Sequence, residues 1–232
     1  MSDIMIFKRY EKKYLISVDQ YKKIMSVIAD RLVPDAHGKG TICSLYLDTP
    51  DFLLIRNSID AISYKEKLRL RSYGAPGQEK NLYFEIKKKY NGVVYKRRVS
   101  MTPEMAASYI ENGEMPFDSQ VMREIDYLMH FYHSPKPGVC ILCEREAFFD
   151  KENPDVRLTF DENLRYRYGF PTVENINDGT YLTDKNEYVL EIKTPGAMPL
   201  WLARTLSECE IYPRSFSKYA HAYYDIMKQE RE

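Results

Sequence analysis

YFEIKKKYNGVVYKRRVSM, residues 83–101, reads as a β-hairpin and decides the fold. Two runs of alternating residues flank Asn91-Gly92, a pair that favours the left-handed backbone of a tight hairpin turn. Like charges that face each other on paired strands repel. A chain that gathers cations on one face of a hairpin therefore needs something to neutralise them. That face carries Glu85, Lys87, Lys89, Lys96 and Arg98.

The composition excludes several classes of protein. The chain has 232 residues, enough to bury a real core, and its 34 Lys and Arg are balanced by 34 Asp and Glu. Because there is no bulk positive charge to attract nucleic acid, any anion site must come from local clustering of cations. Aromatic residues make up 13%, which is typical of a folded, β-rich protein. We find no apolar run long enough to span a bilayer and no leader, so we expect a cytoplasmic protein.

Period-two alternation continues through the rest of the chain and predicts about eight strands. Hairpin signals and short connections favour antiparallel pairing. No linker, repeat or change in composition divides the chain, so we expect one domain over residues 1–232. The expected strands are 9–17, 41–49, 63–74, 83–90, 93–101, 138–150, 155–167 and 187–194.

Helix signals lie between these strands and at the end of the chain. Ser17 and Gln20 have the spacing of a capping box, which predicts a helix over residues 17–32. Thr102-Pro103-Glu104 is a favourable helix start, and Gly113 is a plausible stop. Helices around a mainly antiparallel sheet define the α+β class, in which the sheet can close into a barrel. The other helical segments are a short turn near 50–51 and residues 118–133, 198–209 and 215–230.

The same alternation puts charged residues on one face of most strands. An antiparallel sheet commonly has a dry face and a solvated face, and charges on a solvated face need no further explanation. Here the charged face is mostly Lys and Arg, and the helices need the apolar face, so the charged face either meets bulk water or rolls inward. Outside the hairpin it comprises Arg9, Glu11, Lys13, Lys67, Arg69, Arg71, Arg145, Arg157, Thr159, Asp161, Glu191 and Lys193.

An inward-facing row of cations would imply an anionic guest. If eight strands close, the interior is wide enough for side chains or one small ligand. Unpaired cations in that space would be costly to bury, and a bound polyanion removes that cost. Phosphates are the natural guest, because Arg and Lys form short charge-assisted hydrogen bonds to their oxygens. Glutamates in the same row could hold a divalent metal.

Seven motifs, in this order along the chain, resemble a known family: YEKKYLI, KLRLRSYG, FEIKKK, YKRR, VRLTFD, VLEIK and FSKYAHAYY. Together they are similar to the catalytic domain of the VTC (vacuolar transporter chaperone) polyphosphate polymerases, within the triphosphate tunnel metalloenzymes or CYTH superfamily. The resemblance runs from about Phe7 to the C-terminal helix. It implies an eight-stranded antiparallel β-barrel, the triphosphate tunnel, with helices packed outside. The C-terminal helix would flank or plug the tunnel.

The resemblance also implies an activity and a site. Polymerases of this type transfer the γ-phosphate of ATP to a growing polyphosphate chain with the help of Mn²⁺ or Mg²⁺. The attacking group is already a phosphate oxyanion, so positioning and charge can carry the reaction without a nucleophilic side chain. The implied phosphate-binding residues are Lys13, Arg69, Arg71, Lys87, Lys96, Arg98, Arg145, Arg157 and Lys218, with Lys89, Lys193 and Arg214 assisting. The implied metal ligand is Glu191, with Glu85 and Glu11 as weaker candidates.

The sequence departs from the superfamily in its N-terminal signature, Glu-x-Glu-x-Lys. Arg9 stands at the first acidic position, before Glu11 and Lys13. Loss of that carboxylate weakens the case for the metal-rich hydrolytic site of the triphosphatases and mildly favours a polymerase. The membrane segments of the eukaryotic relatives are not among the motifs, so coupling to translocation would need a separate membrane partner.

Other functions remain open at this stage. A tunnel triphosphatase would hydrolyse inorganic triphosphate or a nucleotide, and a binding module would hold polyphosphate or a nucleotide without turnover. We do not expect a nucleic-acid partner, because the cations alternate with aliphatic residues rather than aromatic ones and Gly38-Lys39-Gly40 is too short for a phosphate-binding loop. Cysteine is sparse, which predicts ordinary buried thiols rather than a disulfide framework: Cys43, Cys140, Cys143 and Cys209.

Overall fold

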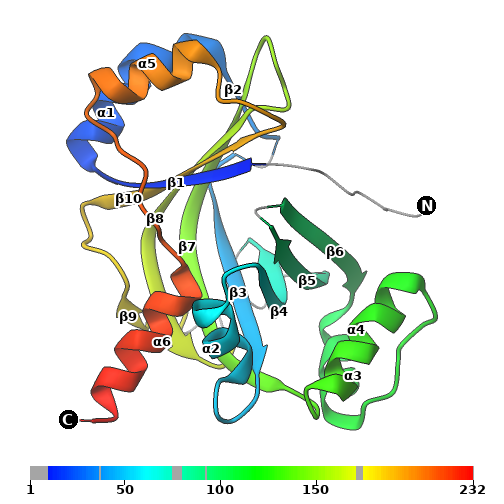
Figure 1. Ribbon diagram of the computed structural model, residues 1–232. Helices are drawn as coiled ribbons and strands as arrows, with labels where there is room; N and C mark the ends of the chain where they lie inside the picture. Colours follow the sequence, from blue (N-terminus) through cyan, green and yellow to red (C-terminus); the bar gives the residue numbers. More distant parts are fainter. Residues whose placement is uncertain (1–9, 37, 75–79, 92, 171–174, 232) are drawn as a thin grey trace.

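The computed structural model describes residues 10–36, 38–74, 80–91, 93–170 and 175–231, and its centre is one antiparallel sheet (Figure 1). Eight strands follow one another in the order β1-β10-β8-β7-β3-β4-β5-β6, which confirms the predicted α+β class and eight-strand path. Two short strands that the sequence did not predict, β2 and β9, pair with β7 and β8. The strands are β1 (Tyr10–Ser17), β2 (Leu32–Pro34), β3 (Gly40–Asp48), β4 (Tyr64–Tyr73), β5 (Leu82–Tyr90), β6 (Val93–Met101), β7 (Lys136–Asp150), β8 (Arg157–Tyr168), β9 (Thr180–Tyr181) and β10 (Glu187–Thr194).

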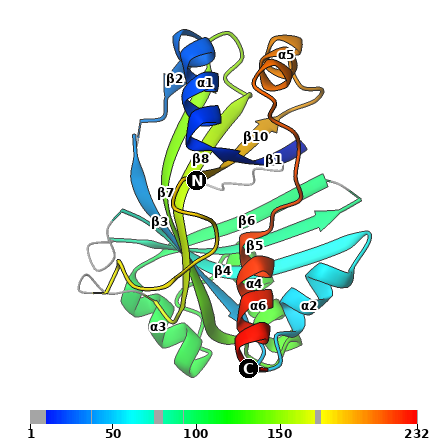
Figure 2. The same cartoon turned by 90° about the vertical axis from the view of Figure 1, so that its left-hand side faces the viewer.

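The sheet curves strongly but its backbone ladder does not close. Strands β1 and β6 are the two ends of the path, and no ladder joins them within the described residues. Figures 1 and 2 show β1 lying across from β5 and β6, so the curved sheet surrounds an interior space. The tunnel is therefore a rolled sheet with a seam between its first and last strands, rather than a barrel closed by hydrogen bonds.

The helix ends follow from local sequence. Ser17 and Gln20 form the predicted capping box, in which the Gln20 amide donates to Ser17 Oγ at 3.1 Å. Gly113 ends α3 with φ of +78°, a backbone conformation that glycine adopts without strain. The helices are α1 (Val18–Ile28), η1 (Ala29–Arg31), α2 (Leu53–Asp60), α3 (Pro103–Asn112), α4 (Gln120–Phe131), α5 (Leu200–Glu208) and α6 (Lys218–Gln229).

Helix α2 is longer than the short turn predicted from the sequence. Its first turn is stabilised by a residue outside the helix. The Asp48 carboxylate at the end of β3 accepts hydrogen bonds from the backbone amides of Leu54 at 2.8 Å and Ile55 at 3.0 Å. The residue that precedes the helix, Phe52, has a left-handed backbone and supplies no side-chain cap. A capping residue this far upstream is outside the usual spacing that sequence patterns test.

Two separate hydrophobic cores cover the outer face of the sheet. Helices α3 and α4 pack on β4 and β5, where Phe84 and Ile86 are fully buried. Helices α1 and α5 pack on β1, β8 and β10, around Leu158, Leu190 and Ile192. Each such side chain contributes about 1.5–3 kcal/mol through burial. Since α1, α3, α4 and α5 occupy the apolar face, the charged face of the same strands is turned toward the interior, where its side chains line the cavities.

The hairpin has the predicted register. Lys87 lies opposite Lys96 and Glu85 opposite Arg98, so the cations of both strands share the inner face. Asn91 has the positive φ that the turn requires, at +46°, while Gly92 lies outside the described residues. All four cysteines are buried thiols outside any disulfide, as predicted. In the part of the chain that the structure describes, no helix is both long enough and apolar enough to span a membrane.

Candidate functional site

The inner face of the sheet encloses two contiguous cavities, which we call the first and second compartments. The first has a volume of about 610 Å³ and reaches from the centre of the sheet toward Lys65 and Lys89, beside the β5–β6 turn. The second has a volume of about 530 Å³ and reaches the opposite end, beside Lys39 and Tyr73. Side chains that line both compartments are Glu11, Ile42, Arg71, Val94, Lys96, Arg145 and Lys193.

The structure brings nearly all the site residues implied by the sequence to these walls. Predicted residues that line the first compartment alone are Lys13, Arg69, Lys87, Lys89, Glu191, Arg214 and Lys218. Those that line both are Glu11, Arg71, Lys96, Arg145 and Lys193, and those that line the second alone are Arg98 and Arg157. Glu85 is the exception, because it is fully buried beneath the wall. Arg9, the departure from the superfamily signature, lies outside the described residues.

Glu85 is surrounded by cations. Its Oε2 accepts Arg69 Nε at 2.9 Å and lies 4.0 Å from Arg71 Nε, and its Oε1 lies 2.5 Å from Lys96 Nζ. Burial would raise the pKa of Glu85, but Arg69, Arg71 and Lys96 together hold it well below its usual range. Because its oxygens already face three cations, its contacts favour a fixed counter-ion over a metal ligand.

Asp161 has the same arrangement on the opposite side of the cavity. It is fully buried, accepts two hydrogen bonds from Arg145, with Nη2–Oδ2 at 2.7 Å, and also contacts the ammonium of Lys218. Burial would raise the pKa of Asp161, but Arg145 and Lys218 hold it well below its usual range. Ser217 caps α6 and so fixes Lys218 at the first position of that helix. The sequence placed Asp161 on the charged face but gave it no role.

Two carboxylates, Glu11 and Glu191, line the first compartment. Glu11 pairs with Lys87 at 2.8 Å, and Glu191 pairs with Lys193 at 3.0 Å and with Lys13 at 3.9 Å. Burial would raise the pKa of Glu191, but Lys193, Lys13 and Lys87 hold it well below its usual range. Burial and Glu191 also oppose the ionisation of Glu11, yet Lys87 and Lys193 lower the pKa of Glu11 on balance.

These two carboxylates fit a divalent cation that is shared with phosphate. They lie on adjacent strands, β1 and β10, close enough to influence each other's ionisation. Mg²⁺ commonly binds to one or two carboxylates and completes its shell with substrate phosphates and water. Among the described residues, no group of three or more His, Cys, Asp or Glu is placed to hold a metal by itself. Glu191 and Glu11 could thus supply the protein ligands of a site that phosphate completes.

Lys67 and Tyr46 are candidate site residues that the sequence prediction left out. Lys67 Nζ donates to Ser217 Oγ at 2.9 Å, and burial lowers the pKa of Lys67 to about 8. Tyr46 accepts a hydrogen bond from Arg69 Nη1 at 3.2 Å. Burial opposes its ionisation, but Arg69, Lys67 and Arg71 outweigh that effect and lower the pKa of Tyr46 to about 7. In the sequence, Lys67 belongs to the alternating row of charged residues and could have been selected. Tyr46 lies within the apolar run of β3, and no sequence pattern distinguished it.

The arrangement as a whole is an elongated cavity in which cations far outnumber carboxylates. In the first compartment, no carboxylate partner is recorded within the described residues for Lys12, Lys65, Lys67, Lys89 or Arg214. Burial lowers the pKa of Lys96 to about 7 despite its pairing with Glu85. A chain of phosphates would supply the negative charge that this wall lacks, through short charge-assisted hydrogen bonds.

Comparison with known proteins agrees with this geometry. The profile of the VTC domain matches residues 8–226. A candidate adenylate cyclase from Bacillus halodurans superposes with a TM-score of 0.57 at 16% identity, covering 92% of this chain and 96% of that one. A Hippeastrum protein, a candidate adenylyl cyclase with a dominant triphosphatase activity, gives 0.57 at 17% identity, covering 92% and 93%. A Pyrococcus horikoshii protein gives 0.50 at 11% identity, covering 94% and 98%.

These structural similarities, all at low identity, show a common fold. No curated protein sequence matches the chain.

Proposed function

Because the chain belongs to the VTC domain family, we propose that it is a polyphosphate polymerase, which transfers the γ-phosphate of ATP to a growing polyphosphate chain. The observation that carries this proposal is the convergence of cations from seven strands and one helix on one elongated cavity. Such a cavity suits a linear polyanion better than a compact ligand. It also explains why like charges face each other across the β5–β6 hairpin.

The chain's own residues would bind and align the phosphates. Arg69 and Arg71 on β4 and Lys87 on β5 lie on one side of the first compartment, and Arg145 and Lys218 lie on the other. Phosphoryl transfer needs the attacking and leaving oxygens in line and charge stabilisation on the transferred group. Cations that are held in place would supply the charge stabilisation and help to align the phosphates.

The buried carboxylates would keep those cations fixed. Glu85 holds Arg69 and Lys96, and Asp161 holds Arg145 and Lys218, so these groups need little rearrangement when charge develops on the leaving ADP. Electrostatic stabilisation is most effective when the charged groups are oriented before the reaction. Glu191 and Glu11 would hold Mn²⁺ or Mg²⁺, which supplies further neutralisation of the phosphate oxygens when bound.

A product assay tests the proposal. The purified chain is incubated with ATP and Mn²⁺ or Mg²⁺, and the products are resolved on a denaturing gel. A ladder of long anionic chains is expected. Free phosphate without a ladder would indicate a triphosphatase instead of a polymerase. Unchanged ATP that binds with measurable affinity would indicate a binding module.

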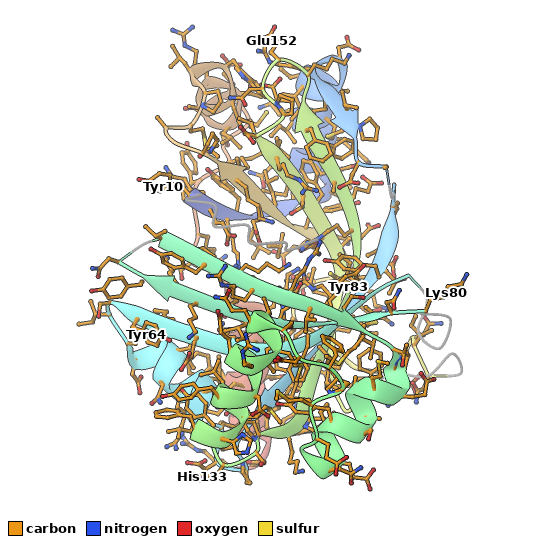
Figure 3. All side chains as sticks on the ribbon, turned by 90° about the vertical axis from the view of Figure 1, so that its right-hand side faces the viewer. Tyr10, Tyr64, Lys80, Tyr83, His133 and Glu152 are labelled. Carbon is orange, nitrogen blue, oxygen red and sulfur yellow. The ribbon has the colours of Figure 1, made fainter. Side chains whose placement is uncertain are left out.

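Two variants sharpen that assay. Lys218→Ala removes a cation from the cavity and should eliminate the ladder. Lys80→Ala removes an exposed cation that points away from the molecule, as Figure 3 shows, and should leave the ladder unchanged. If both variants lost activity to the same extent, general electrostatics rather than the cavity would account for it.

A further inference from the structure

The inward rows of β4 and β5 end differently at the two ends of the cavity. At one end Lys65 on β4 lies opposite Lys89 on β5, so both rows end in lysine. At the other end Arg71 lies opposite Tyr83, and Tyr73 is the last residue of β4. Figure 3 shows Tyr83 on the side of the molecule away from Tyr64, the first residue of β4. The cation row therefore gives way to aromatic residues at one end.

These aromatic residues form a ledge with Arg98, which we call the Tyr73 ledge (Tyr73, Tyr83 and Arg98). The rings of Tyr73 and Tyr83 meet edge to face, with centroids 5.5 Å apart. Arg98 lies over the Tyr83 ring at 4.9 Å, and Arg71 lies 5.9 Å from the Tyr73 ring. Tyr73 lines the second compartment and is still 43% exposed. The Tyr73 side chain is therefore accessible to a ligand in that compartment.

Two cations that line only the second compartment are already paired with carboxylates. Arg157 is paired with Asp35 at 2.6 Å, and Lys39 is paired with Glu162. The Thr159 side chain lines the same compartment and is 3% exposed, and its Oγ1 has no hydrogen-bond partner in the described part of the chain. Paired cations beside an aromatic ring and a spare hydroxyl favour a neutral, polar, planar group at this end of the cavity over further phosphates.

We propose that the second compartment is a nucleoside site, in which the base of ATP stacks on Tyr73 while its phosphates extend past Arg71 into the first compartment. This rests on the proposed use of ATP. Tyr73 and Arg71 are two residues apart on one strand, which is about 7 Å, room for a ribose between base and phosphate. The compartment volume of about 530 Å³ lies within the range of known small-molecule sites.

Stacking also defines what the site can and cannot discriminate. Every nucleobase has a π-face, so stacking on tyrosine binds bases with little preference among them. The ledge should therefore separate nucleoside triphosphates from inorganic triphosphate, and treat ATP and GTP alike. Thr159 Oγ1 can add one hydrogen bond to the base or ribose.

The test compares two ligands that differ only in the nucleoside. Dissociation constants of ATP and of inorganic triphosphate are measured by calorimetry for the wild type and for Tyr73→Ala. Loss of one base-stacking contact is expected to weaken ATP binding about tenfold. Binding of inorganic triphosphate should stay within about twofold. Tyr73→Phe, which keeps the ring, should bind ATP like the wild type.

Tyr95→Ala is the matched control, because Tyr95 is an exposed tyrosine of similar accessibility on the outer face of the same sheet. Tyr95→Ala should leave the dissociation constants of both ATP and inorganic triphosphate unchanged. If Tyr73→Ala does not fold, Tyr73→Leu keeps the bulk without the aromatic face and should show the same selective loss. Equal weakening of both ligands, or no weakening of ATP, would overturn the nucleoside site. Failure of the wild type to bind either ligand would instead overturn the proposed function.

Discussion

Replacing Glu85 by Gln separates a fixed counter-ion from a metal ligand. The substitution keeps the size of the side chain but leaves Arg69, Lys96 and Arg71 without the carboxylate they surround. Breaking a buried ion pair by removing one partner costs about 3–5 kcal/mol. The lower end applies here, because the Lys96 side chain is 37% exposed and can turn toward water. A domain of this size loses about 2–4 °C of Tm for each kcal/mol, so Tm should fall by about 6–12 °C.

Added inorganic triphosphate should reverse much of that loss. At one hundred times its Kd, a ligand that binds only the folded state adds about 2.7 kcal/mol of stability. Because the variant cavity is more positive than the wild-type cavity, it should bind triphosphate at least as tightly. The assay is thermal unfolding of both proteins with and without triphosphate. Glu152→Gln, which removes an exposed carboxylate paired with Arg31, should shift Tm by less than about 3 °C.

An unchanged Tm for Glu85→Gln, together with loss of the metal-dependent reaction, would refute this reasoning. Glu85 would then be a metal ligand, as the family resemblance implied.

Three further predictions concern the cavity wall. Glu191→Ala should abolish turnover on the product gel and leave triphosphate affinity within a few-fold; full activity would remove the metal assignment. Lys87→Ala and Arg71→Ala should each weaken triphosphate binding about 10–100-fold at low ionic strength, as expected for a lost charge-assisted hydrogen bond, and less in high salt. Unchanged affinity in both variants would mean that their strands face solvent. Between pH 7 and 9, triphosphate affinity should fall, because Lys96 and Tyr46 both lose protons with a pKa of about 7. An anionic ligand favours their protonated forms, so binding should take up protons, measured by calorimetry in two buffers of different ionisation enthalpy; a pH-independent affinity would contradict this.

The elements that could be predicted from the sequence are those set by local spacing. The alternation around Asn91-Gly92 gave the hairpin and its cationic face, because a period of two assigns every side chain to one side of a sheet. Ser17 and Thr102 allowed the starts of two helices to be predicted. A capping side chain and the backbone amide that it accepts from lie within one turn of each other in the sequence. The motifs of the resemblance implied the eight-stranded antiparallel sheet and most of the residues that line the cavity.

The parts that could not be predicted depend on contacts between distant strands. Glu85 reads as one more acid in an alternating run, and only the register of β4 shows that Arg69 holds it. Asp161 gains its role from Lys218, which comes from the last helix. Tyr46 lies in an apolar stretch, and its altered ionisation arises from Arg69 and Lys67 on the neighbouring strand. The cation rows end in lysine at one end of the cavity and in tyrosine at the other. This difference can be interpreted only when the two compartments are known.

The open edge between β1 and β6 has a consequence for how a long polymer enters. On that side the wall is held by side chains, such as Glu11 with Lys87, and no ladder of backbone hydrogen bonds joins the two edges in the part of the chain that the structure describes. Ion pairs weaken as the salt concentration rises, whereas the backbone ladders between the other strands do not. Opening the wall therefore costs the least free energy at this edge. Under the proposed function, a polyphosphate chain of any length would enter from the side and would not need to be threaded through one end.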